Sequence, residues 1–127
     1  PLIYASLLYV RKNEKHKKQF LSLKIPEISV VVVNLYPFEK YKNNNKIDNS
    51  IEMIDVGGPS LLRAASKNFE SITSVIDTDD YKKLIKNIQK NNGSTDINFR
   101  RRMAQKVFRK TSNYDRIIEK WFNEFEK

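Results

Sequence analysis

The fold is predicted most directly by the stretch ISVVVVNL at residues 28–35, a nearly continuous run of apolar, mostly β-branched side chains. A run that does not alternate with polar residues is typical of a strand buried on both faces, as in a parallel sheet covered by helices. Tyr36-Pro37-Phe38 follows at once, and Pro37 stops the strand because its nitrogen carries no hydrogen to donate. We therefore expect this stretch to be a central strand of an α/β fold.

The segments around this strand alternate between helical and strand patterns. Residues 2–10 are apolar and look buried, 14–24 are amphipathic and end before Pro26, and the Asn-rich residues 41–45 indicate a loop. The later segments predict helices over 48–54, 59–68 and 81–90, a second strand over 71–76, and one or two helices over 95–126. This order predicts an open parallel α/β sheet with flanking helices in 1–93 and a helical extension in 94–127.

The composition is that of one globular domain, with 127 residues of which 39% are hydrophobic and 31% charged. Because there is no Cys and only one His, we expect no disulfide, no thiolate nucleophile and no structural zinc, as suits a reducing cytoplasm. No apolar run approaches the roughly 18 to 20 residues of a membrane-spanning helix. The net charge of +9 is compatible with nucleic-acid binding, but Lys outnumbers Arg and Asn is abundant, which favours a solvated basic surface.

The first candidate site follows the first predicted strand, because ligands of open parallel sheets bind beyond the carboxyl ends of the strands. Asn34 can both donate and accept hydrogen bonds, and Tyr36 adds a phenol. The alternative is a strand that ends in a turn with a half-buried tyrosine, and the spacing by itself favours that alternative.

The second candidate site is the turn Asp55-Val56-Gly57-Gly58-Pro59, which precedes a predicted helix. Backbone amides at a helix start lack intrahelical partners, so together with the helix dipole and two glycines they suit an oxyanion, a carboxamide or a phosphate. A plain turn explains the same residues, and the spacing of a phosphate-binding P-loop is absent.

Two basic side chains near these candidates have structural explanations. Lys67 closes the predicted helix, where a cation stabilises the negative end of the dipole. Eight residues of helix rise roughly 12 Å, so Lys67 meets Asp55 only if the entering loop folds back or the lysine extends toward it. His16 lies among lysines and is expected on the solvated surface.

Two longer motifs, VVVNLYPF at 31–38 and IDVGGPSLLRAASKN at 54–68, resemble the amino-terminal domain of the bifunctional purine biosynthesis enzymes. Those enzymes combine phosphoribosylaminoimidazolecarboxamide formyltransferase with IMP cyclohydrolase. The resemblance extends to residues 1–11, 77–81 and 111–122, so it covers nearly the whole chain.

This resemblance implies a methylglyoxal-synthase-like α/β domain, incomplete at its N-terminus, that closes the last ring of inosine monophosphate from the 5-formamido precursor with loss of water. By motif position Tyr36, Asp55 and Lys67 match catalytic residues, which we expect to converge on one purine-sized hollow. The positions that match substrate-binding residues are Asn34, Val56, Gly57 and Gly58. No metal or other cofactor is implied, and 10-formyltetrahydrofolate would serve only the formyltransferase domain, which is absent.

The resemblance also implies what residues 1–127 lack. The family's Lys-Thr-Leu-His segment would lie immediately before Pro1, and the upstream strand and phosphate-holding loop are missing. Tyr4 and Phe69 stand where many relatives carry His. We therefore expect this stretch alone to bind its purine nucleotide substrate poorly and to turn over little or none of it, while the parent protein is expected to be a cytoplasmic homodimer that binds no specific nucleic acid and no membrane.

One alternative from another class remains open, a non-catalytic methylglyoxal-synthase-like module that binds a nucleotide or a phosphate. Such a module needs phosphate contacts but has no use for a tyrosine, an aspartate and a lysine together. The presence of Tyr36, Asp55 and Lys67 therefore favours the enzyme.

Overall fold

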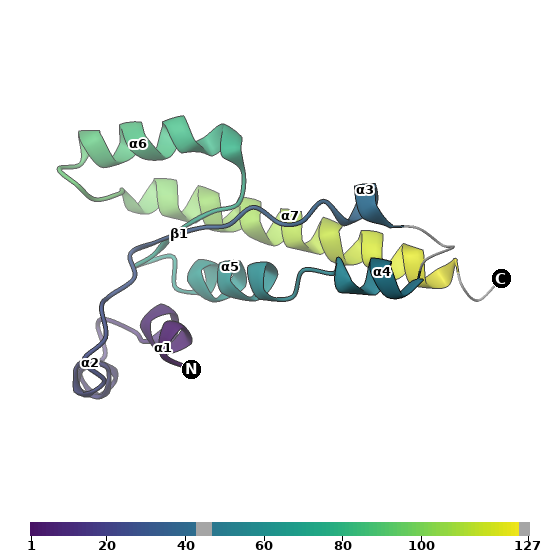
Figure 1. The fold of residues 1–127 in the computed structure, drawn as a ribbon. Coiled ribbons are helices and arrows are strands. Elements are labelled where there is room, and N and C mark those ends of the chain that lie inside the picture. The colour runs from purple at the N-terminus through teal and green to yellow at the C-terminus, as the bar shows by residue number, and fades with distance from the viewer. Residues whose placement is uncertain (43–46, 125–127) are drawn as a thin grey trace.

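The computed structural model describes residues 1–42 and 47–124, and in these the chain is organised along one long helix (Figure 1). The elements are, in chain order, α1 (Leu2–Leu8), α2 (Glu14–Ser22), β1 (Val30–Val32), α3 (Phe38–Tyr41), α4 (Ile47–Glu52), α5 (Gly57–Lys67), β2 (Thr73–Val75), the 3-10 turn η1 (Thr78–Asp80), α6 (Tyr81–Lys90) and α7 (Ile97–Asn123). None of the described helices is both long and apolar enough to cross a membrane.

The two strands pair in parallel, as the sequence predicts. The paired positions are Val30 with Thr73, Val31 with Ser74, and Val32 with Val75. Residues paired in a parallel sheet point to the same face. Val31 and Ser74 face α5, where the hydroxyls of Ser74 and Ser66 share a hydrogen bond of 2.8 Å. The α/β class is thus confirmed, with α5 as the crossover helix between the strands.

The opposite face of the sheet is covered over β2 only. Thr73 shares a hydrogen bond of 2.7 Å with Thr95, and Val75 packs on apolar side chains of α6 and α7. Val30 and Val32 of β1 lie on this same face and are 38% and 43% exposed. The expected strand over 28–35, buried on both faces, is therefore wrong in length and in burial. The physical reason is that α6 and α7 pack over β2 and leave the neighbouring face of β1 uncovered within the described residues.

The helix α7 supplies the largest part of the core. Its buried positions recur every three or four residues, which places them on one stripe of the helix. They are Phe99, Met103, Ala104, Val107, Thr111, Tyr114 and Trp121. This stripe packs on α5 and β2 and, near its C-terminal end, on α3. The segment expected as a helical extension is one helix, and its apolar face belongs to the same core as the sheet.

The helix α1 is tied to the segment before β1 through the buried hydroxyl of Ser6. Ser6 Oγ donates to the carbonyl of Pro26 at 3.1 Å and accepts the N–H of Ile28 at 2.8 Å. Residues 2–8 form α1, in which Leu7 is fully buried. Leu2, Ile3, Leu8 and Val10 are 44–57% exposed, because α1 packs on α5 through one face only, so the expectation that residues 2–10 are buried is mostly wrong. The predicted helix over 14–24 is confirmed as α2, whereas the loop expected over 41–45 begins within α3 and falls mostly on residues 43–46, outside the described part.

Truncation of a core leucine tests this arrangement. Leu62 of α5 is fully buried against Ile76 and Val107, so Leu62→Ala should lower the free energy of unfolding by about 2–5 kcal/mol through lost burial and a residual cavity. Leu21→Ala is the control, because Leu21 is 65% exposed on α2 and its truncation should cost no more than about 0.5 kcal/mol. Urea titration followed by circular dichroism measures both, and equal effects would contradict the assigned core.

Candidate functional site

A groove of about 820 Å³ lies beyond the carboxyl ends of β1 and β2, where the sequence predicts a site. One wall comes from the residues that follow β1, a second from those that follow β2, and a third from α7. The lining residues that the following argument uses are Asn34, Tyr36, Asp77, Lys110, Asn113 and Tyr114. The volume is within the range of small-molecule sites, about 300–1,000 Å³.

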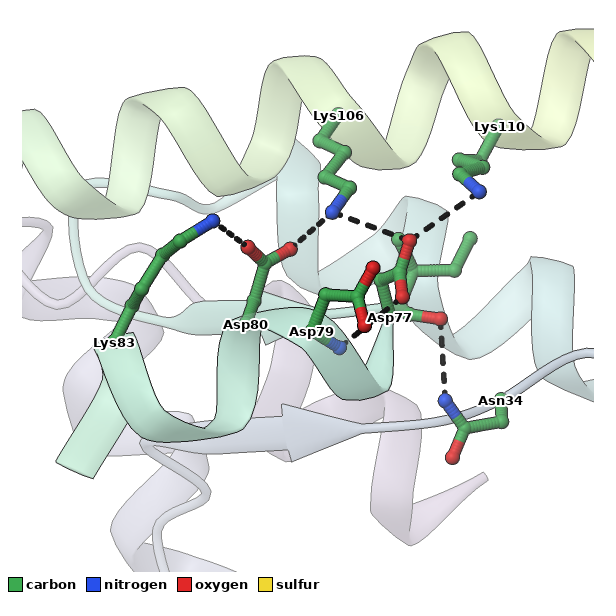
Figure 2. A network of polar contacts seen from close by, with 8 residues as sticks. Asn34, Asp77, Asp79, Asp80, Lys83, Lys106 and Lys110 are labelled. Atoms are coloured by element: carbon green, nitrogen blue, oxygen red, sulfur yellow. Dashed lines mark hydrogen bonds and ion pairs between the residues drawn. The ribbon is translucent and has the colours of Figure 1, made fainter.

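Asn34 joins the two strand ends at this groove. Its side-chain N–H donates to the carbonyl of Ile76 at 3.2 Å, and its side-chain oxygen accepts the phenol O–H of Tyr81 at 2.6 Å. Figure 2 shows the Asn34 amide directed at the backbone that leads into η1. An amide has two N–H donors, so Asn34 retains one for a ligand while its oxygen is occupied.

Tyr36 lies in the groove with a largely free side chain, 59% exposed. Two residues later Phe38 is almost fully buried against Trp121, with the rings edge-on at 5.3 Å between centroids. The buried Phe38 therefore anchors the short helix α3 and fixes the chain that carries Tyr36. This places a phenol where the sequence predicts one.

Asp55 lies beside the groove and caps the helix that follows it. Its carboxylate Oδ1 accepts the N–H of Gly58 at 2.8 Å, and its own backbone N–H donates to the phenol oxygen of Tyr114 at 2.8 Å. The first contact satisfies an amide at the start of α5, and the second attaches the loop to α7. Tyr114 lines the groove, so this hydrogen bond connects the Asp55 loop to the groove.

The expected amide cradle at the start of α5 is mostly occupied by the chain itself. The Gly58 N–H is bonded to Asp55, Pro59 has no N–H, and the Ser60 N–H is bonded to the carbonyl of Val56 at 3.3 Å. In the first turn of α5, Gly57 is therefore the one residue whose N–H has no partner among the described residues. Of the predicted backbone contacts, Gly57 is accessible and Gly58 is buried.

Lys67 does not line the groove. In a parallel strand–helix–strand unit the helix runs antiparallel to the strands, so its first residue lies at the carboxyl edge of the sheet and its last at the amino edge. The 11-residue helix α5 is about 16 Å long, which separates Lys67 from Asp55 by the height of the sheet. Tyr36 and Asp55 are therefore near the groove, whereas Lys67 lies exposed at the opposite edge, and the three side chains do not converge within this chain.

A network of charges forms the wall between β2 and α7, and the sequence analysis does not single it out (Figure 2). Asp80 is 1% exposed, and Lys83 and Lys106 donate to its two carboxylate oxygens, Lys83 at 2.8 Å. Lys106 also pairs with Asp77 at 3.2 Å, and Asp77 with Lys110 at 3.3 Å. The spacing of Lys106 and Lys110 by one helical turn, facing an acidic turn, is the signal that could have indicated it.

The charge states of this network follow from its hydrogen bonds. Burial by itself would raise the pKa of Asp80, but the bonds from Lys106 and Lys83 outweigh it and hold the pKa below its ordinary value. Burial would lower the pKa of Lys106, but both carboxylates raise it. The Asp79 N–H, helped by Lys106 and Lys110, lowers the pKa of Asp77 to about 2. Asp77, Asp80 and Lys106 are therefore charged at neutral pH.

No three His, Asp or Glu side chains gather to hold a metal ion anywhere in residues 1–42 and 47–124. The groove instead offers amides, phenols, two lysines, Lys40 and Lys110, and two carboxylates, Glu39 and Asp77. This set is suited to a polar organic ligand held by hydrogen bonds.

A parallel strand–helix–strand core with a ligand-sized groove at its carboxyl edge defines the chain as an α/β binding or catalytic domain. The crystal structure of ForH is similar in fold, with a TM-score of 0.85 and 29% sequence identity over 94% of this chain and 62% of that one. The family profile described as the AICARFT/IMPCHase bienzyme matches residues 65–127.

Two bacterial relatives match almost the entire chain. The bifunctional purine biosynthesis protein PurH of Chlorobium chlorochromatii is 48% identical over 120 residues, which is 93% of this chain and 23% of the relative. PurH of Ruminiclostridium cellulolyticum is 40% identical over 126 residues, which is 98% of this chain and 24% of the relative. The chain belongs to the AICARFT/IMPCHase bienzyme family, and it spans about a quarter of the length of these relatives.

The two glycines before Pro59 should respond differently to alanine. A Cβ on Gly58 would lie 2.6 Å from Asp55 Oδ2, so Gly58→Ala should displace the carboxylate, break the cap and cost about 1–2 kcal/mol of stability. A Cβ on Gly57 meets nothing within 4 Å, so Gly57→Ala is the matched control and should be neutral or stabilising by up to about 1 kcal/mol. Chemical denaturation measures both, and equal values would contradict the cap.

Acid should weaken the Asp77 contacts selectively. Because the folded-state pKa of Asp77 is lowered, to about 2, its carboxylate stabilises the fold above about pH 4, and this contribution is lost as the pH falls through 2. The stability difference between the wild type and Asp77→Asn should therefore be constant above about pH 4 and should shrink toward pH 2. Asp115→Asn, at an exposed residue without an ion pair in the described chain, is the control for the removal of a surface carboxylate.

Proposed function

We propose that the chain is part of an IMP cyclohydrolase domain of a bifunctional purine biosynthesis enzyme, and that the groove beyond β1 and β2 binds the purine nucleotide. In the proposed reaction the carboxamide nitrogen of the 5-formamido-imidazole-4-carboxamide ribotide attacks the formyl carbon. The new carbon–nitrogen bond closes the ring, and the former formyl oxygen leaves as water with two protons.

One observation carries this proposal. Asn34, Tyr36 and Tyr114 line the same groove, and Tyr114 is hydrogen-bonded to the backbone of the Asp55 loop. The segments that bear Tyr36 and Asp55 are the two motifs on which the family resemblance rests. A site for this reaction has to hold both reacting groups of one substrate in contact and to stabilise the charge that develops on the formyl oxygen. Fixed phenols and amides at the edge of a sheet suit that task.

The proposed roles follow from the chemistry of each group. Tyr36 would position the carboxamide or the formyl oxygen, and Asp55 would orient a proton donor near the departing hydroxyl. Lys67 would supply or share that proton. Its assignment rests on the family motif alone, because α5 places it at the opposite edge of the sheet from the groove.

The proposed partners are a small purine nucleotide and, in the parent protein, a second copy of the same chain. Trp121 is fully buried in the core beside Phe38, so it is not part of a surface for association. Phe122, the neighbouring aromatic residue, is exposed, so a second subunit could contact it.

Turnover tests the catalytic assignment in the complete gene product that contains residues 1–127. Asp55→Asn and Lys67→Met should each lower kcat for ring closure by about 10²- to 10⁴-fold with an unchanged melting temperature, since a positioned acid or base contributes that much. Lys86→Met is the matched control, because Lys86 is an exposed lysine of α6, remote in sequence from both motifs.

Other results of this turnover experiment would change the assignment. Wild-type rates in both variants would remove Asp55 and Lys67 from the mechanism, and a loss in Asp55→Asn alone would remove only Lys67. A wild type that binds inosine monophosphate tightly and forms no product would replace the enzyme by the non-catalytic nucleotide-binding module.

A further inference from the structure

We infer that Tyr114 of α7 is a ligand-contacting residue of the groove, whose phenol O–H donates a hydrogen bond to a carbonyl oxygen on the base of the bound nucleotide while its oxygen holds the Asp55 loop. This inference rests on the proposed function, because it assigns the ligand to the same groove. Neither the two sequence motifs nor the spacing of charged residues points to Tyr114.

Tyr114 is a buried and well-packed member of the groove lining. The residue is 7% exposed, and its ring packs in the cluster formed by Phe38 and Trp121. It lines the groove together with Tyr36, which comes from the other side, after β1. A phenol fixed in this way offers a hydrogen bond of defined direction and loses little conformational entropy when a ligand binds.

The hydrogen bonds of the phenol leave one group available. The oxygen accepts the Asp55 N–H at 2.8 Å, while a phenol carries in addition one O–H donor. In the part of the chain that the structure describes, no acceptor lies within bonding distance of that hydrogen. A largely buried donor without a protein partner costs free energy unless water or a ligand accepts from it.

The phenol is in its neutral, donating form. Burial raises the pKa of Tyr114, and the carboxylates of Asp55 and Asp115 raise it further, against a smaller opposing effect of the Asp55 N–H. The group therefore keeps its proton at neutral and mildly alkaline pH.

The groups nearby favour an uncharged acceptor over an anion. The charged lining groups are two carboxylates, Asp77 and Glu39, and two lysines, Lys110 and Lys40, so their formal charges cancel, and Asp77 and Lys110 are paired at 3.3 Å. Asn113, one residue before Tyr114, and Asn34 add neutral amides to the lining. A neutral donor beside amides matches the carbonyl or amide edge of a heterocyclic base better than it matches a phosphate.

The same contact gives Tyr114 a second effect, on Asp55. The Tyr114 oxygen accepts the Asp55 N–H, and the Asp55 carboxylate caps α5 at Gly58. A ligand that is hydrogen-bonded to the Tyr114 phenol is therefore connected through it to the loop that bears a proposed catalytic group. Tyr114 thereby fixes the position of Asp55 relative to the base of the ligand.

The test compares two nucleotides that differ in one carbonyl. In the complete gene product containing residues 1–127, Tyr114→Phe should weaken the binding of inosine monophosphate by about 3- to 10-fold, the usual value of one hydrogen bond. It should weaken the binding of purine riboside monophosphate clearly less, because that nucleotide has no oxygen on the base and only the contact of Tyr114 with the Asp55 loop is lost. Tyr41→Phe is the matched control, because Tyr41 is exposed on α3 and does not line the groove, and it should bind both nucleotides as the wild type does.

The outcomes separate this inference from the proposed function. Wild-type binding of both nucleotides by Tyr114→Phe would overturn the inference alone, and so would an equal loss for both, since that result assigns Tyr114 only to holding the loop. A wild type that binds neither nucleotide would overturn the proposed function and the inference with it.

A second measurement covers the case in which Tyr114→Phe does not fold. Site-specific 3-fluorotyrosine at position 114 of the otherwise unchanged protein reports on the phenol by fluorine NMR. Inosine monophosphate should shift this resonance and purine riboside monophosphate should not. Equal shifts, or none, would contradict the hydrogen bond to the base.

Discussion

The structure depends on the packing of one stripe of α7 against β2 and α5. A sheet of two short strands cannot bury an apolar face by itself, and three paired residues on each strand supply few ladder bonds. The seven buried positions of α7 add the surface that makes the unit stable, from Phe99 beside β2 to Trp121 beside α3. Because α7 runs nearly the length of the molecule (Figure 1), its buried stripe extends from the core of the sheet to the groove.

Charge determines how α7 is oriented on that core. Asp80 is buried at the start of α6, and a buried carboxylate is costly unless it is paired. Lys106 meets Asp80 and Asp77 together, so a rotation of α7 about its axis would leave both carboxylates without their main partner. Apolar packing holds α7 on the sheet, and this pairing favours one rotation of the helix. That rotation in turn directs Lys110, Asn113 and Tyr114 toward the groove.

The sequence predicts the parallel α/β core because its strands and helices have distinct periodicities, which local residues determine. It does not predict that Val30 and Val32 are exposed, since their burial depends on whether α6 and α7 extend over β1. The turn before α5 is predicted too, but only the folded loop shows that the Asp55 carboxylate occupies the Gly58 amide. The sequence does not single out Tyr114, because an aromatic residue at helical spacing resembles any other core residue until its hydroxyl contact is known.

The groove therefore combines walls of two kinds. The wall after β1 bears one of the family motifs, whereas α7 contributes side chains that fit the pattern of an amphipathic helix. The Asp55 loop, which bears the other motif, is not among the lining residues and is connected to them where Tyr114 accepts the Asp55 N–H, a hydrogen bond between residues 59 positions apart. Chemistry that relies on Asp55 is for this reason linked to the packing of α7. A substitution in the α7 core that shifts the helix would displace the phenol, the loop and the carboxylate together, without touching a bound nucleotide.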